Sequence, residues 1–296
     1  DAPSLRDGKF HRVVALAEEH PLKHLTHGGP AQWKQRFRTE IKRGTAKPYA
    51  IDRIGLPFEN PWKALIYCAG HDFLPDGTAV ICTFQGDVWH VSNFSGTSKQ
   101  ATWRRYASGL SQTMGIVTVG KDVYVQGRDQ ITRLHDLNND GEADFYECFS
   151  NAFRSSFAGH AFICGLERDT DGNFYTASNQ GLIRVSPDGK RADVLATGFR
   201  NPDGLGLLPD GTLTVPSAEG TWTPASLIGA VNPKTPNALA VSDAAGASIP
   251  HFGLGGPRKA TPPNLPLVYL PRALDNSSGG QVYVSSDQWG PLKGRL

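Results

Sequence analysis

A short pattern recurs along most of this chain and constrains its fold more than any other feature. One or two apolar residues precede an Asp-Gly turn, a β-rich run, a glycine and a second β-rich run. Asp-Gly pairs suit tight hairpins that need positive φ, and a spacing of about 40–45 residues is that of a four-stranded propeller blade. We therefore predict an all-β propeller with five partial blades. The clear copies are Phe73–Val91, Leu166–Val185 and Leu207–Val215, and the weaker ones are Thr118–Val125 and Gly280–Val284.

The chain divides into two parts on this reading. Residues 61–296 carry the repeats, whereas in residues 1–60 the segments His11–Glu19 and Ala31–Lys42 have helical spacing with charged faces. We expect a short helical N-terminal extension before the propeller. The closing residues, Trp289–Leu296, are typical of the lead into another strand. The propeller is therefore expected either to belong to a longer polypeptide or to be closed by the N-terminal segment or another chain, because open blade edges are prone to association.

One stretch has the spacing of a calcium-binding loop. Oxygen-bearing side chains fall at loop positions 1, 3, 5, 9 and 12, with Gly141 at position 6 for the sharp turn. The flanking residues alternate like strands, so the loop is expected to join β-strands. Every ligand position is filled and no open coordination site is evident, so a bound metal is expected to be structural. An Asp/Asn/Gly turn without metal is the alternative. The predicted ligands are Asp136, Asn138, Asp140, the Glu142 carbonyl, Asp144 and Glu147.

Composition excludes several classes of function. The chain has 296 residues, 33 of them glycine and 21 proline, which suits a turn-rich β protein better than a helical bundle. A formal charge of +2 is too small an excess of positive charge to indicate binding to nucleic acid or an anionic membrane. No apolar run approaches the roughly 20 residues that span a bilayer, so no transmembrane segment is expected.

The four cysteines, Cys68, Cys82, Cys148 and Cys164, form no CxxC or CxxCH motif. Zinc ribbons, thioredoxin chemistry and covalently attached haem are therefore not expected here. Each neighbouring pair brackets one strand-turn unit, so two local disulfides are one possibility in an exported protein. Free thiols buried in strands are the other.

Three segments carry residues suited to chemistry and lie beside the inner strands of predicted blades. They are Ser155–His160, Gly198–Gly204 and Pro216–Thr223. Loops that lead into inner strands converge on the central channel of a propeller, so these segments are expected to meet. A histidine, an Arg-Asn pair and a glycine-lined turn in one pocket suit an oxidation, with a base for a hydroxyl proton and cations and amides for an anionic cofactor.

These segments resemble the soluble PQQ-dependent glucose dehydrogenase family, six-bladed propellers that oxidise sugars with pyrroloquinoline quinone (PQQ) and Ca²⁺. The resemblance covers about residues 60–296, with the order of motifs preserved and few identities. It implies six blades, His160 as catalytic base and Arg200-Asn201-Pro-x-Gly as a quinone contact. The implied cofactor-binding residues are Gln112, Arg200, Asn201, Glu219, Gly220 and Thr221, the last three resembling a Glu-x-Gly-Pro calcium turn without its proline.

The chain is also similar in texture to large bacterial proteins assigned as membrane-bound dehydrogenases. They share phrases such as Pro57–Trp62, Gly127–Leu134 and the Asp136 loop followed by Asp-Phe-Tyr-Glu. Many carry a haem c domain further along the chain. This resemblance strengthens the expected fold more than the function.

The favoured hypothesis is a calcium-binding, exported quinoprotein, periplasmic or extracellular, that oxidises a sugar or related alcohol with PQQ. A cytochrome c or another electron acceptor would then be a partner. Two alternatives belong to other classes. The propeller could be a non-catalytic binding or docking module, or a cofactor-free sugar hydrolase or lyase with His160 as base.

Overall fold

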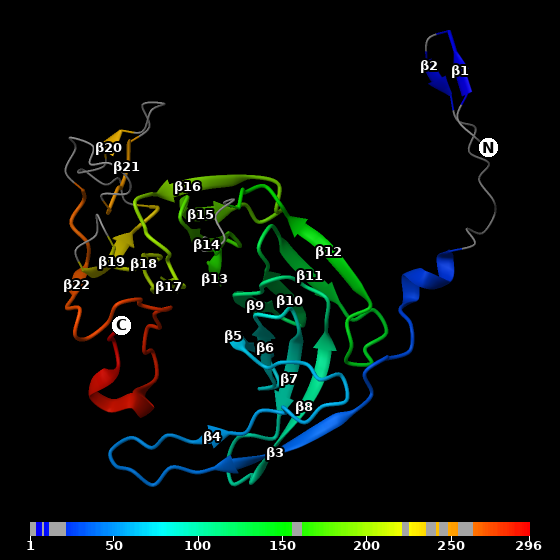
Figure 1. The fold of residues 1–296 in the computed structure, drawn as a ribbon, viewed down its shortest axis with the longest axis horizontal. Coiled ribbons are helices and arrows are strands. Elements are labelled where there is room, and N and C mark those ends of the chain that lie inside the picture. The colour runs from blue at the N-terminus through cyan, green and yellow to red at the C-terminus, as the bar shows by residue number, and fades with distance from the viewer. Residues whose placement is uncertain are drawn as a thin grey trace.

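The computed structural model describes residues 4–7, 9–11, 22–155, 162–220, 225–234, 241–242, 248–253 and 263–296. In these residues the protein is a β-propeller with almost no helix. Four four-stranded blades follow one another around an arc (Figure 1), each an antiparallel meander. Their inner strands contact one another in turn, β5 with β9, β9 with β13, and β13 with β17.

The first two blades are regular. The strand Ala79–Thr83 is buried along most of its length, because both of its faces are covered. Val80 and Cys82 pack toward the second blade, and Ala79 and Ile81 pack against the Trp89 side of the sheet. The first comprises β5 (Cys68–Phe73), β6 (Ala79–Thr83), β7 (Val88–Ser92) and β8 (Gln100–Ala107), and the second β9 (Gly115–Val119), β10 (Asp122–Gln126), β11 (Ile131–His135) and β12 (Phe145–Ser150).

The fourth blade differs from the third in its outer strand, which comes from much later in the sequence. A small ladder of β20 (Val241–Ser242) and β21 (Ser248–Ile249) lies between its last two strands in the chain. The third blade comprises β13 (Cys164–Arg168), β14 (Phe174–Ser178), β15 (Gly181–Val185) and β16 (Ala192–Ala196), and the fourth β17 (Gly206–Leu207), β18 (Leu213–Ser217), β19 (Ser226–Val231) and β22 (Val268–Leu270).

The prediction of six blades is therefore wrong for the part of the chain that the structure describes, where four are present. Four of the five repeat copies coincide with blade strands. The fifth, Gly280–Val284, forms no ladder and lies instead beside the inner strand of the fourth blade, since an isolated bridge joins Asp203 to Gly279. The last stretch of the chain ends in a short 3-10 helix, η2 (Asp287–Leu292).

The predicted helix over Ala31–Lys42 is also wrong. Its second half is strand β3 (Arg36–Lys42), which pairs with β8 and with β4 (Arg53–Ile54), so the first blade becomes a six-stranded sheet. Phe37, Thr39 and Ile41 face the blade, and the charged residues between them face solvent, which is the period of two of a strand. Most of the other predicted helix, His11–Glu19, lies outside the described residues. Before β3 come a β1 (Ser4–Arg6)–β2 (Lys9–His11) hairpin and the 3-10 helix η1 (Lys23–His27).

The hydrophobic core lies between the blades. Val80 and Val88 of the first blade pack with Val123 and Leu134 of the second, and equivalent clusters join the second blade to the third and the third to the fourth. A further cluster around Trp89 and the other first-blade tryptophan, Trp103, is completed by β3. Because each interface is apolar and buried, the blades hold the loops at both faces in fixed positions.

The four cysteines are free thiols in this structure. Cys82 and Cys164 are buried in inner positions of their blades, and burial raises the pKa of each to about 12. Cys68 and Cys148 are exposed. Of the two states expected from the sequence, the structure has the free thiols. Among the described residues, no helix is long and apolar enough to cross a membrane.

Candidate functional site

Two faces of the propeller follow from its strand order. In each antiparallel blade the chain enters the inner strand and turns between its second and third strands at one face. We call this the entry face. The turns between the first and second strands and between the third and fourth strands lie at the opposite face, which we call the hairpin face. The segments around Gln112, Arg200 and Glu219 all belong to the entry face.

At the fourth blade the structure brings several predicted residues together. The Arg200 guanidinium donates to the carbonyl oxygen of Glu219, and its backbone N–H donates to the hydroxyl of Ser217 at 2.8 Å. The backbone carbonyl of Arg200 in turn accepts from Ala218 N–H at 2.8 Å. A side chain at Gly220 would overlap the Arg200 guanidinium, so glycine is needed for this close approach.

The same cluster contains two features that fix its neighbours. Asn201 has a left-handed φ of +41°, and its N–H donates to the Asn179 side chain of the third blade at 2.7 Å. Asp203 accepts from the Ser277 hydroxyl at 2.7 Å, and Arg272 lies 2.6 Å from the Glu219 carboxylate. Residues from four separate segments thus meet at the start of β17.

Gln112 lies at the entry face of the second blade with a φ of +48°. Its side-chain oxygen accepts from the Arg128 guanidinium at 2.7 Å. No contact of the described residues joins it to the Arg200 cluster. Two predicted site residues, His160 and Thr221, lie outside the described residues. Phe162, just after the first of them, packs edge-on against Phe84 with ring centroids 5.7 Å apart.

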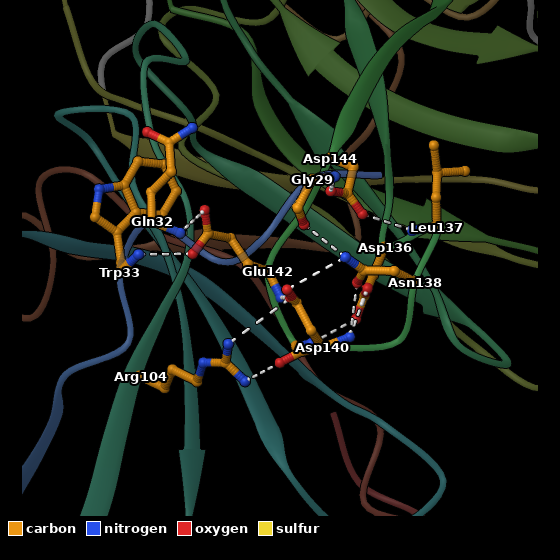
Figure 2. A network of polar contacts seen from close by, with 11 residues as sticks. Gly29, Gln32, Trp33, Arg104, Asp136, Leu137, Asn138, Asp140, Glu142 and Asp144 are labelled. Atoms are coloured by element: carbon orange, nitrogen blue, oxygen red, sulfur yellow. Dashed lines mark hydrogen bonds and ion pairs between the residues drawn. The ribbon is translucent and has the colours of Figure 1, made fainter. Parts of the chain in front are cut away.

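The second predicted site, the Asp136 loop, connects β11 to β12 at the hairpin face (Figure 2). Asp136 accepts backbone N–H groups of Asp140 at 3.1 Å and Gly141 at 2.8 Å. Asn138 accepts from Asp140 N–H at 2.9 Å, and Gly141 has the expected positive φ, +84°. These bonds curl the loop around its own acidic side chains.

The loop also holds the segment that precedes β3. Glu142 is buried, and its two carboxylate oxygens accept the N–H groups of Gln32 at 2.9 Å and Trp33 at 2.7 Å (Figure 2). Asp144 accepts from Gly29 N–H at 2.8 Å and from Leu137 N–H at 2.9 Å. We call Gly28–Trp33 the strap. Its attachment to the loop has no signal in the local sequence pattern, because the partners are more than 100 residues apart.

The structure tests how well this loop suits calcium. Asp136, Asn138, Asp140 and Asp144 lie in one loop and supply the oxygen ligands that Ca²⁺ takes. Among the described residues, however, no three His, Cys, Asp or Glu side chains gather closely enough to hold a metal. Glu147, predicted to close the site, lies in β12 and pairs with His135 at 2.7 Å and Arg133 at 3.8 Å. The residue types of the loop therefore suit calcium, but the described structure does not gather their side chains into a metal site and does not bring Glu147 to the loop.

Sequence reasoning missed several residues of both sites. Arg128, Asn179 and Arg104 come from neighbouring turns or strands, and Arg104 donates to the Asp140 carbonyl. An arginine after Gly127 and an asparagine after β14 are ordinary turn residues by pattern alone. Only the blade geometry places them at the two sites.

The comparisons with known proteins bear on the fold. No family model and no curated protein matches the sequence. Among solved structures, the PQQ-bound aldose sugar dehydrogenase of Streptomyces coelicolor is similar over 84% of this chain and 76% of its own, with a TM-score of 0.55 and 13% identity. A Thermus thermophilus protein assigned as an oxidoreductase (glucose dehydrogenase) is similar over 75% and 74%, with a TM-score of 0.52 and 17% identity.

The fold of this protein is thus a β-propeller of the kind found in PQQ-dependent sugar dehydrogenases. At these identities the likeness concerns the fold alone. The resemblance to the large membrane-bound dehydrogenases finds no support in these comparisons.

Proposed function

We propose that the protein is an exported, calcium-binding quinoprotein oxidoreductase that oxidises a sugar or related alcohol with PQQ. The observation that carries the proposal is the cluster at the start of β17, where Arg200, Asn201 and Glu219 meet on the entry face. This is a site of converging cations and amides in a fold shared with a PQQ-bound sugar dehydrogenase.

The residues present suit an anionic quinone in their chemistry. Arg200 is exposed, and Arg272 reaches the same cluster, so both guanidinium groups are at the surface of the entry face. The close approach at Gly220 leaves room for no side chain beside Arg200. PQQ, when bound, would supply a quinone that accepts two electrons from the substrate carbon. Arg200 and Asn201 would hold the cofactor and stabilise negative charge on its oxygens.

His160 would be the base that takes the hydroxyl proton of the substrate. Thr221 and Gln112 would complete the cofactor-binding set. Calcium would be structural at the Asp136 loop, held by the side chains at positions 1, 3, 5 and 9 and by the Glu142 carbonyl. The Glu219 carbonyl, which belongs to the turn that resembles a calcium-binding turn, accepts from Arg200. A cytochrome c or another acceptor would remove the electrons.

The test is a titration of the purified protein with PQQ in the presence of Ca²⁺, followed by the quinone absorbance. Saturable micromolar binding that Arg200→Ala weakens at least tenfold is expected, since a guanidinium–carboxylate contact contributes roughly 1.5–3 kcal/mol. Arg191→Ala is the matched control, because that arginine is an exposed residue of the third blade that pairs only with Asp193 among described residues.

Dye reduction with a panel of sugars and added PQQ then tests catalysis, with His160→Ala as the inactive variant. Absence of PQQ binding by the folded protein would exclude the dehydrogenase. Turnover of unsaturated or keto-sugars without an acceptor would indicate the hydrolase or lyase instead. Lack of both activities would leave a docking module.

A further inference from the structure

A cavity of about 440 Å³ opens on the hairpin face, between the third and fourth blades. Its walls are the β13–β14 turn at Arg168–Thr170, the β17–β18 turn at Leu207–Gly211 and the segment Gln281–Tyr283. Because these are first-to-second turns, the cavity lies on the face opposite to Arg200 and Glu219. It therefore belongs to neither the proposed quinone site nor the Asp136 loop, which is on the second blade.

Glu167 lines this cavity. It comes from inner strand β13, is half-buried, and its carboxylate accepts no hydrogen bond from the described residues. Burial, and to a smaller extent the charge of Asp72 on β5, raises its pKa to about 7. Because Glu167 lines the cavity and its carboxylate has no partner among the described residues, the carboxylate is available to accept hydrogen bonds from a ligand there.

Some of the other polar side chains of the cavity wall already have hydrogen-bond partners, and others do not. Tyr175 already donates to Asp169 at 2.8 Å. The Tyr283 hydroxyl has no partner among the described residues. The side-chain amide of Gln281 is less available, because its nitrogen donates to the Gly279 carbonyl and its oxygen is buried. A carboxyl and a phenol are therefore left for a ligand, and both bind hydroxyl groups.

The charges of the wall argue for a neutral ligand. Arg168 stacks on Phe174 at 5.6 Å, and Lys234 pairs with Asp171 at 3.5 Å. Asp169 and Asp210 also line the cavity, so its cations are balanced by carboxylates and no excess positive charge remains for an anion. Leu207, Leu208, Pro209 and Val282 add apolar surface of the kind that contacts the C–H groups of a ring or chain.

We propose that this cavity is a second small-molecule site, which binds a neutral polyhydroxy compound of monosaccharide size through Glu167 and Tyr283. Its volume lies in the lower part of the range of about 300–1,000 Å³ that is typical of small-molecule sites. The site is independent of PQQ and of the reaction proposed above. A polyol bound in this cavity would contact the propeller at the hairpin face, opposite to the proposed quinone site.

The experiment uses myo-inositol and xylitol as neutral polyhydroxy probes, and it omits PQQ so that the proposed dehydrogenase cannot oxidise them. Saturation-transfer difference NMR and calorimetric titration on the full chain, without PQQ, measure their binding. Saturable binding is expected, with at least about a tenfold loss in Glu167→Leu, since removing a hydrogen-bonding partner costs about 1–3 kcal/mol. Tyr283→Phe removes one hydroxyl at the cavity edge and is expected to weaken binding by about three- to tenfold without loss of fold.

Two control variants make the result specific. Glu59→Leu alters an exposed glutamate far from the cavity in sequence, and Arg200→Ala alters the entry face; neither is expected to change the affinity. Circular dichroism of each variant verifies folding. Absence of saturable binding to the folded wild-type protein overturns the proposal. So does binding that Arg200→Ala abolishes and that Glu167→Leu and Tyr283→Phe leave unchanged, because the polyol would then sit on the entry face.

Discussion

Replacing Glu142 by alanine tests whether the acidic loop anchors the strap. The carboxylate of this buried residue accepts two backbone N–H groups of the strap, from Gln32 and Trp33. Hydrogen bonds to a charged group contribute roughly 1.5–3 kcal/mol each, and the freed N–H groups regain water because they are only partly buried, so the expected loss is about 2–4 kcal/mol. Glu142→Gln keeps one acceptor oxygen and should lose about half as much.

The assay needs two readouts, because the strap can detach without unfolding the blades. Urea denaturation measures the global free energy of unfolding, and limited proteolysis under native conditions measures exposure of residues 28–35. We expect Glu142→Ala to be cleaved in this segment at least tenfold faster than wild type, and Glu59→Gln, a change at an exposed glutamate, to behave as wild type. Equal cleavage rates and equal unfolding free energies in Glu142→Ala and wild type would refute the anchoring argument.

Four further predictions concern other parts of the molecule. Added Ca²⁺ should raise the melting temperature of wild type and not of Asp136→Ala, measured by scanning calorimetry with and without chelator; an equal shift in both proteins would place calcium elsewhere. The Arg105 guanidinium lies 2.6 Å from the buried Asp87 carboxylate. Arg105→Met leaves that carboxylate without its cation and should lower the unfolding free energy by about 3–5 kcal/mol. A change under about 1 kcal/mol in urea titrations would contradict this. Leu213→Ala empties a fully buried position of β18 and should cost about 2–5 kcal/mol in the same titrations. The pKa of Glu167 is raised from 4.5 to about 7, so the folded state binds the proton more tightly and stability should fall as pH rises through that interval; Glu167→Gln should flatten this part of the pH profile, and an unchanged profile would contradict the assigned pKa.

The propeller could be predicted from the sequence because its repeats are local. Each Asp-Gly turn joins strands only a few residues apart, and the copies at Phe73–Val91 and Leu166–Val185 coincide with blade strands. The number of blades could not be predicted in the same way. Gly280–Val284 has the residues of an inner strand, but a strand also needs a partner strand. In the structure the segment has the bridge at Gly279 and backbone hydrogen bonds of Val284 to Gly294 and Arg295, which form no ladder.

The helix prediction at Ala31–Lys42 failed for a related reason. Charged residues alternate with Phe37, Thr39 and Ile41, and a window of this length fits both a helical and a strand period. The choice is made by β8, which lies far along the chain and supplies the ladder. Tertiary pairing therefore outweighs local propensity at this segment.

The candidate sites were predictable in their residue types and not in their contacts. The Arg200–Gly204 turn was found because its residues are unusual together, and the structure joins it to Glu219 and Gly220 as expected. Glu167 had no such signal, since a glutamate in a strand is ordinary in sequence. Its importance depends on burial and on the absence of a partner among the described residues, which only coordinates show.

The pairing of β3 with β8 has a consequence for how the chain folds. Trp103 donates from its indole N–H to the Thr39 hydroxyl at 2.9 Å, across a separation of 64 residues. The meander β5–β8 closes through short turns, whereas β3 must wait until β8 offers its outer edge, since long loops close more slowly than short ones. Strand β3 is therefore expected to pair last, with a blade that has already formed. A fragment that begins at residue 61 would keep that meander and leave the outer edge of β8 bare, open to a strand from another molecule.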